Sequence, residues 1–219
     1  MSATTDNTED STEDNTETND NRYKRNPAKR VFAIEFNDAT HEVSDGDSER
    51  SPNYAVLPTG ERANRVYMCG TLMETEDVGN DSEYWRGRFV DNSDPDGGVQ
   101  DCYIYAGEYQ SEAMNFLKSV EPPVYISVVG KPNRYETDDG DVYVSISPEL
   151  IKEVDVQERN TWVVDTASQT LRRLDNFAAQ RDDENVDEDV AIALEEYGYD
   201  VLKYKQGVVE ALEYLRDEQ

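Results

Sequence analysis

Residues 85–117 read WRGRFVDNSDPDGGVQDCYIYAGEYQSEAMNFL, and this stretch carries the clearest structural signal in the chain. Residues 84–91 and 99–106 each alternate in the manner of a strand, and residues 92–98 between them are rich in Asp, Pro and Gly. That composition is typical of a turn, so the two strands are predicted to form a hairpin. After the hairpin the apolar residues take a helical spacing, which predicts a helix over residues 111–119.

Further strands are predicted on both sides of this segment. Residues 66–74 form a strand-like run with Gly70 inside it, where a glycine indicates a bulge or a sharp coil. Residues 124–131 and 142–151 are two more strands, joined by a polar loop at residues 132–141. Three strands, one helix and two strands is the order of the five-stranded Greek-key barrel called the OB-fold. A small meander or an SH3-like barrel is the alternative, and the place of the single helix favours the OB-fold.

The segment before the barrel divides into a polar tail and a short extension. Residues 1–21 contain no apolar residue larger than Ala after Met1, so this tail is predicted to be disordered. A basic cluster follows, composed of Arg22, Lys24, Arg25, Lys29 and Arg30. It either neutralises part of an acidic protein or forms an arm that contacts phosphate. Residues 31–36 and 54–57 are predicted to be short strands on either side of a polar loop at residues 37–52.

Past residue 156 the strand pattern ends and helices are predicted. They cover residues 161–180, residues 190–197 with Gly198 as C-cap, and a last segment capped by Asp200. Because these helices lack a core of their own, each must pack on the barrel or on a partner. The predicted fold is therefore mainly β with α extensions, a five-stranded OB-fold Greek-key barrel followed by C-terminal helices. Its predicted parts are an acidic tail and basic arm at 1–29, an N-terminal strand extension at 30–60, the OB-fold domain at 61–158 and the helical region at 159–219.

The charge of the chain is extreme. It has 49 acidic and 21 basic residues in 219, which gives a formal net charge of −28. An acidic disordered chain and a folded protein adapted to very high salt both fit this charge. The 14 Tyr, 5 Phe and 2 Trp favour folding, because acidic disordered chains are poor in aromatic residues. We therefore expect a halophilic globular protein.

Several classes of function are disfavoured. No run approaches the ~18 apolar residues of a membrane span, and no signal-peptide pattern is present, so a cytoplasmic protein is expected. His41, the only histidine, is interpreted as a solvated loop residue, which argues against His-based triads and most zinc sites. Cys69 and Cys102 lack a CxxC spacing and are interpreted as small buried hydrophobic residues. No catalytic residue, metal site or cofactor is predicted, and we do not expect an enzyme.

Three stretches resemble a known family. Residues 85–117 resemble strands two and three of replication protein A OB-domains, and residues 124–155 (VYISVVGKPNRYETDDGDVYVSISPELIKEVD) resemble strands four and five. With residues 53–75 (NYAVLPTGERANRVYMCGTLMET), the whole of 31–219 is similar to the archaeal replication-protein-A-associated proteins of haloarchaea. The resemblance implies a non-enzymatic accessory subunit of a replication protein A complex in DNA replication and repair. Its implied partners are single-stranded DNA and the large replication protein A subunit.

OB-folds bind single strands on the faces of strands two and three and on neighbouring loops, using aromatic rings that stack on bases and cations that follow the backbone. On strand two Phe89 is the better core residue, so the arginines on either side of it in the alternation point outward. On strand three the small apolar residues belong inside, which places the two tyrosines outside. The candidate nucleic-acid-binding residues are Arg86, Arg88, Tyr103, Tyr105, Lys131, Arg134 and Tyr135. Because the net charge repels a polyanion, binding by this subunit alone is expected to be weak.

An alternative hypothesis makes the barrel a protein-interaction module with no nucleic-acid contact. In this case Tyr103 and Tyr105 are buried under the helix at residues 161–180, and Arg86 and Arg88 are held in ion pairs.

The helix at residues 161–180 is also the predicted partner interface. Its apolar residues are Trp162, Leu171, Leu174 and Phe177. Together they form more apolar surface than a barrel of this size leaves in water. The resemblance implies the same role, because in the replication protein A family the helix after the barrel commonly mediates subunit association. If this helix is instead an internal core element, the assembly surface is expected in residues 200–219.

Overall fold

The computed structural model describes residues 26–46 and 51–218. The predicted acidic tail and the first three residues of the basic cluster lie outside the described residues. The last two residues of that cluster form β1 (Lys29–Arg30). None of the described helices combines the length and the hydropathy that a membrane-spanning segment needs.

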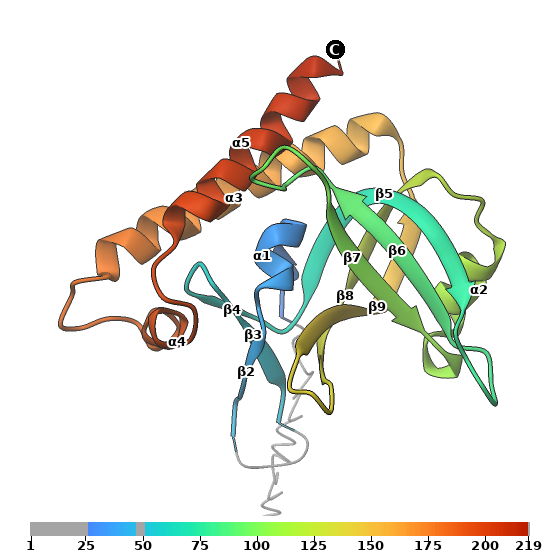
Figure 1. The fold of residues 1–219 in the computed structure, drawn as a ribbon, viewed down its shortest axis with the longest axis horizontal. Coiled ribbons are helices and arrows are strands. Elements are labelled where there is room, and N and C mark those ends of the chain that lie inside the picture. The colour runs from blue at the N-terminus through green and yellow to red at the C-terminus, as the bar shows by residue number, and fades with distance from the viewer. Residues whose placement is uncertain (1–25, 47–50, 219) are drawn as a thin grey trace, which may run out of the picture.

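A closed barrel of five strands forms one side of the molecule, on the right in Figure 1. The strands are β5 (Val66–Asp77), β6 (Trp85–Asp91), β7 (Gln100–Ala106), β8 (Val124–Glu136) and β9 (Val142–Glu153). They follow the order β5, β6, β7, β9, β8, and β8 pairs back onto β5. Within the barrel only β7 and β9 run parallel, at Ile104 and Ile146. With η1 (Glu108–Gln110) and α2 (Ser111–Ser119) between β7 and β8, this is the OB-fold, as predicted.

Strand β5 bends so that it can pair on both sides of the barrel. Its first half pairs with β8 and its second half with β6, and the register with β6 shifts between Leu72 and Glu74. The bend brings β6 so close that a Cβ atom at Gly70 would lie 2.4 Å from the backbone oxygen of Val90. A glycine is therefore required there, in agreement with the irregularity predicted from the sequence.

The prediction of a strand at residues 31–36 is wrong, because residues 33–37 form a short helix, α1 (Ala33–Asn37). Its residues 33–36 are all buried, between the barrel and the C-terminal helices. A strand with one solvated face would expose alternate residues, whereas a helical turn enclosed on all sides buries consecutive ones. The end of β6 and the turn after it accept the hydrogen bonds of the free helix N–H groups: Asp91 Oδ2 from Ala33 N at 2.7 Å and Ser93 Oγ from Ile34 N at 3.2 Å.

The polar segment predicted to be a loop also contains a strand, and His41 is not a solvated loop residue. β2 (His41–Ser44) pairs with β3 (Asn53–Leu57), which pairs with β4 (Glu61–Ala63). The backbone N–H of His41 donates to Tyr197 Oη at 2.8 Å, and its Nδ1 lies 3.3 Å from a carboxylate oxygen of Glu196. Pairing with β3 explains the strand, since residues 41–44 have little apolar pattern of their own.

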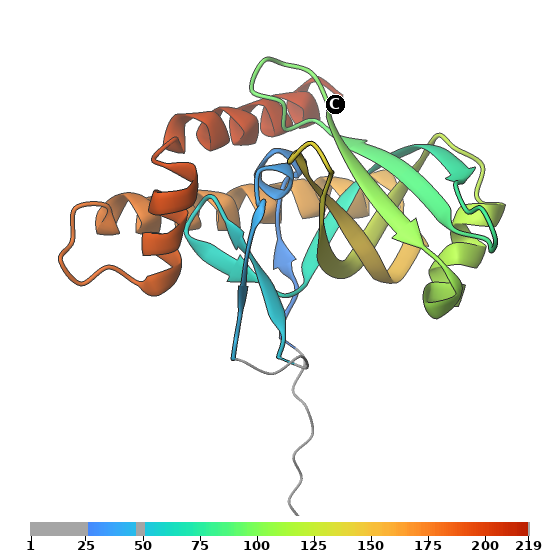
Figure 2. The ribbon, with the colours of Figure 1, turned by 60° about the horizontal axis from the view of Figure 1, so that its bottom comes forward.

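Three helices follow the barrel: α3 (Val156–Gln180), α4 (Glu188–Tyr197) and α5 (Val201–Asp217). Figures 1 and 2 show α3 and α5 side by side and running in opposite directions, with α4 at the end away from the barrel. The predicted caps are present: Gly198 has a φ of 73°, and an Asp200 carboxylate oxygen accepts from Lys203 N at 3.2 Å. Helix α3 begins before the predicted residue 161, where Asp155 Oδ1 accepts from Glu158 N at 2.7 Å.

The prediction that α3 leaves its apolar side chains free for a partner is wrong for Trp162, Leu174 and Phe177. Each is at most 1% exposed, whereas Leu171 is 37% exposed. The ring of Phe32 packs edge-on against Trp162 at 5.5 Å. The chain's own N-terminal segment and its later helices cover α3, so these three residues belong to the core.

One contiguous hydrophobic core joins the N-terminal segment, the barrel and the C-terminal helices. It includes Cys69 and Cys102, which are buried as predicted, and burial raises the pKa of the Cys69 thiol to about 12. A buried ion pair fastens α1 to α3: the Glu35 and Arg173 side chains are 0% and 4% exposed, and Arg173 Nη2 donates to Glu35 Oε2 at 2.6 Å. The parts of the chain therefore depend on one another for stability.

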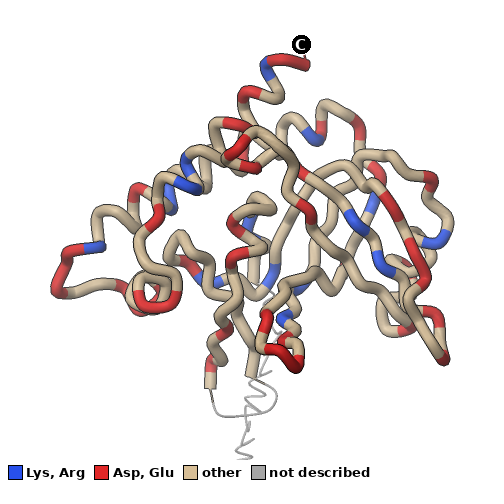
Figure 3. Tube along the Cα trace, in the orientation of Figure 1, with Lys and Arg blue, Asp and Glu red and all other residues tan. Residues whose placement is uncertain are grey.

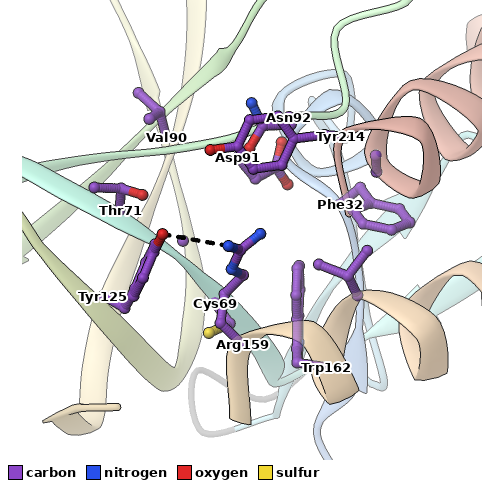
Figure 4. A pocket seen from close by; sticks show the side chains of 13 residues that line it. Phe32, Cys69, Thr71, Val90, Asp91, Asn92, Tyr125, Arg159, Trp162 and Tyr214 are labelled. Carbon is purple, nitrogen blue, oxygen red and sulfur yellow. Dashed lines mark hydrogen bonds between the residues drawn. The ribbon is translucent and has the colours of Figure 1, made fainter. Parts of the chain in front are cut away.

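A small cavity lies between β5, the start of α3 and the end of α5 (Figure 4). The guanidinium of Arg159 sits 4.8 Å from the ring centroid of Tyr125 and 5.4 Å from that of Tyr214, and it pairs with Glu218. The cavity has a volume of about 10 Å³, close to the ~10–15 Å³ that one water needs. It is too small for an organic ligand, and we interpret these contacts as the attachment of α5 to the barrel.

Candidate nucleic-acid interface

An open groove of about 530 Å³ lies between the outer face of β6 and β7 and the hairpin formed by β8 and β9. Five tyrosines line it: Tyr84, Tyr103, Tyr105, Tyr135 and Tyr143. We call it the tyrosine groove. Other lining residues are Arg86, Asn133 and Ser145. The groove thus lies on the face that OB-folds use for oligonucleotides.

Alternation along β6 and β7 places the first half of the site as predicted. Phe89, Cys102 and Ile104 are fully buried. Tyr103 and Tyr105 point to the opposite side and are half-buried. Trp85 is half-buried and packs against the core.

The rings and the arginine of the groove contact one another. The guanidinium of Arg86 lies 5.9 Å from the ring centroid of Tyr103. The rings of Tyr84 and Tyr105 are stacked, with centroids 5.8 Å apart. The floor of the groove is therefore a set of aromatic side chains in contact with one another.

The second half of the site is a hairpin rather than the predicted loop at 132–141. β8 continues to Glu136 and β9 begins at Val142, with Tyr135 opposite Tyr143. The prediction failed because residues 132–136 are polar, so they carry no apolar alternation. Their partner strand holds them extended instead.

Successive residues of β8 point to opposite faces of the hairpin, so Arg134 and Tyr135, both predicted to bind nucleic acid, lie on different faces. Asn133 and Tyr135 line the tyrosine groove. Arg134 is not among its lining residues: its Nε donates to the backbone oxygen of Thr40 at 2.8 Å, and its Nη2 to Glu136 at 2.7 Å. Arg134 therefore braces the hairpin against the N-terminal segment and does not belong to the groove.

The two arginines of β6 are held by carboxylates. Arg86 Nη2 lies 2.6 Å from Glu76, and Arg88 lies 2.9 Å from Glu74 and 2.7 Å from Asp101. Hydrogen bonds to Asp101 and Glu74 raise the pKa of Arg88. Figure 3 shows the same mixture over the whole trace, with basic residues placed among a larger number of acidic ones. The groove therefore offers aromatic surface with little net positive charge.

Sequence reasoning missed Tyr84 and Tyr143. Tyr84 lies two residues before Arg86, so the alternation that placed Arg86 outward also applied to Tyr84. Tyr143 could be found only by extending the hairpin to Tyr135, its partner across the strands. Lys131, the remaining predicted residue, lies outside the tyrosine groove in a neighbouring hollow.

The strand order and the groove define the class: an OB-fold protein with an aromatic groove along β6, β7 and the β8–β9 hairpin. No model of a known protein family matches the chain, and no curated protein matches its sequence.

Similar solved structures include the mitochondrial single-stranded DNA-binding protein Rim1 of S. cerevisiae, with 19% identity, 42% of this chain and 94% of that chain covered, and a TM-score of 0.34. The S. pombe Stn1-Ten1 complex matches with 11% identity, 53% and 78% coverage, and a TM-score of 0.42. An OBody bound to hen egg-white lysozyme matches with 14% identity, 59% and 91% coverage, and a TM-score of 0.39. These identities and TM-scores are too low to support a function for this chain. Its assignment to the OB-fold class rests on the strand order and the groove.

Proposed function

We propose that this protein is a non-enzymatic single-stranded DNA-binding protein that holds the strand in the tyrosine groove. The observation that carries the proposal is the convergence of five tyrosines on one open groove: one stands just before β6, two are on β7 and two are on the β8–β9 hairpin. A base stacked on an aromatic ring contributes ~1–3 kcal/mol, whatever its sequence. Two or three such contacts give useful affinity for a single strand.

Electrostatics modify this binding in an unusual direction. The arginines of β6 are already paired, and the net charge of the chain is −28. Counterion release therefore contributes little, and long-range repulsion opposes binding at low salt. In molar salt the Debye length is about 3 Å, which removes the repulsion and leaves stacking intact. We expect affinity to be kept or to rise as KCl is increased, over the range in which circular dichroism shows a folded protein.

The finer proposal is an accessory subunit of a replication protein A complex, acting in DNA replication and repair in a halophilic cytoplasm. It is supported by the resemblance of residues 31–219 to the replication-protein-A-associated proteins. A groove with little positive charge also suits a subunit that shares DNA with a stronger binding partner. Pull-down from a halophilic host in molar KCl, with mass spectrometry, is expected to return a second OB-fold single-stranded DNA-binding protein. Its absence would remove the subunit proposal.

The groove is tested by replacing Tyr103 and Tyr105 together. The double change to Ala removes two stacking faces, and the double change to Phe keeps both rings. In fluorescence anisotropy with oligo-dT in molar KCl, we expect the Ala variant to lose at least about tenfold in affinity. The Phe variant is expected to bind as the wild type does. Equal binding by all three proteins would exclude these tyrosines from the site.

The alternative function is a protein-interaction module without nucleic-acid contact, which predicts that Arg86 and Arg88 are held in ion pairs. Both arginines are paired in the structure. That hypothesis also requires Tyr103 and Tyr105 to be buried under α3. Both instead line the open groove, which counts against it. Binding of the purified protein to oligo-dT separates the two functions directly.

A further inference from the structure

A second hollow of about 480 Å³ opens where η1 and α2 meet the β8–β9 hairpin. The residues that matter in it are Tyr109, Gln110, Glu112, Lys131, Ser147 and Glu149. It lies outside the tyrosine groove, and the function proposed above does not use it.

The hollow and the tyrosine groove are parts of one track. A polar neck of about 90 Å³ lies between them; it shares Tyr84 and Tyr105 with the groove and Gln110 and Ser147 with the hollow. Alternate residues of the hairpin line the whole track: on β8 they are Lys131, Asn133 and Tyr135, and on β9 Tyr143, Ser145 and Ser147. A single face of the hairpin therefore follows the track from one end to the other.

The side chains of two residues in the hollow take no part in the core or in the ion pairs of the described residues. The side chain of Tyr109 is 100% exposed, although a tyrosine normally buries much of its ring. Among the described residues, the only Lys and Arg side chains with no carboxylate oxygen within 4.0 Å are Lys131, Arg172 and Lys205. Of these three side chains, Lys131 lines the track, and the other two do not.

We propose that this hollow is a second subsite for the same single strand, in which Tyr109 stacks on a base and Lys131 contacts a phosphate. The proposal rests on the proposed function, because it extends the strand beyond the tyrosine groove. Lys131 and Tyr135 are four residues apart on one strand, about 13 Å at 3.3 Å per residue. That distance equals about four stacked nucleotides at 3.4 Å each.

Two carboxylates line the hollow with Lys131, and their effect on a bound phosphate can be tested. Glu149 also lines the hollow, but it pairs with Arg65. Glu112 lines the hollow without a cation partner among the described residues, so it opposes a phosphate there. Replacing Glu112 by Gln is therefore expected to strengthen binding, the opposite direction from the loss of Lys131.

The test is affinity as a function of oligonucleotide length. Anisotropy is measured in molar KCl with oligo-dT from about 4 to about 16 nucleotides, the range of OB-fold site sizes. The wild type is expected to gain affinity once the oligonucleotide reaches both parts of the track. Tyr109→Ala with Lys131→Ala is expected to bind the shortest oligonucleotide normally and to lose about 5- to 150-fold on the longest, the equivalent of one stacked base.

Single variants give independent measurements. Because the side chains of Tyr109 and Lys131 are both exposed, their replacement is not expected to change the fold. Lys131→Ala is expected to make the slope of log affinity against log salt more positive by about 0.7, the value for one phosphate contact on a single strand. Lys205→Ala removes an equally unpaired cation away from the track and is the control, expected to change neither the slope nor the length dependence.

The outcomes separate this inference from the proposed function. If the wild type binds but the double variant matches it at every length, the second subsite does not exist and the tyrosine groove stands. An equal loss at every length would also overturn a separate subsite, because it would place both residues within the first one. If the wild type binds no oligonucleotide, the proposed function fails and the subsite fails with it.

Discussion

Replacing Arg173 by Leu tests how the N-terminal segment is held on the helices. Arg173 reaches from α3 to Glu35 on α1 with two hydrogen bonds, Nε to Oε1 at 3.0 Å and Nη2 to Oε2 at 2.6 Å. The hydroxyl of Thr59 donates to the same carboxylate at 2.5 Å, and Arg173 donates to Thr170 Oγ1 at 2.9 Å. The whole network is buried, so water cannot replace a partner that is removed.

The expected loss follows from that burial. Removing one partner of a buried ion pair costs about 3–5 kcal/mol, because the other charge stays buried without its counterion. For a protein of this size 1 kcal/mol corresponds to about 2–4 °C in Tm, so Arg173→Leu is expected to lower Tm by about 6–20 °C. Replacing Glu35 and Arg173 together by Leu is expected to cost less than Arg173→Leu alone, since no unpaired charge remains.

The measurement is the free energy of unfolding in molar KCl, from denaturant titration followed by circular dichroism. Arg172→Leu is a matched control one residue away: Arg172 is exposed, and its replacement is expected to stay within about 0.5 kcal/mol of the wild type. The reasoning is refuted if Arg173→Leu is as stable as that control, or if the double replacement is less stable than the single one.

Three further predictions concern the core and the barrel. Leu174→Asp with Phe177→Asp is expected to unfold the isolated protein by circular dichroism; a folded double variant that only loses a partner would restore the interface prediction. Burial raises the pKa of Asp91 to about 6. The folded protein therefore holds the Asp91 proton more tightly than the unfolded chain, which stabilises the fold by about 3 kcal/mol below pH ~4. This stabilisation is lost as the pH rises to about 6. Denaturant titrations of the wild type and Asp91→Asn should diverge over that pH range, and parallel curves would contradict the assignment. Gly70→Ala is expected to lower Tm, because its Cβ would lie 2.4 Å from the backbone oxygen of Val90; an unchanged Tm would show that β6 can move away.

The barrel could be predicted because its signals are local. Period-two alternation, a turn rich in Asp, Pro and Gly, and one helix over residues 111–119 define the strand order without knowledge of distant contacts. The same alternation correctly placed Phe89 inside and Tyr103 and Tyr105 outside. These features were predictable because each depends on residues close in the sequence.

The errors share a different origin, which is long-range contact. α1 is a helix because its residues enter a corner formed by the barrel and the distant C-terminal helices. Trp162 and Phe177 are recognisably apolar, but the sequence does not say that residues from the N-terminal segment cover them. The β8–β9 hairpin was missed around Arg134 because polar strands are defined by pairing and not by hydropathy.

The inner face of a barrel strand is constrained by core packing, and its outer face is not. On β7 the inner residues, Cys102 and Ile104, are fully buried in the core, while the outer ones, Tyr103 and Tyr105, are half-buried and line the groove. Mutations that change ligand preference therefore fall on positions that the core does not constrain. Such a fold can vary its outer face while its buried scaffold stays constant.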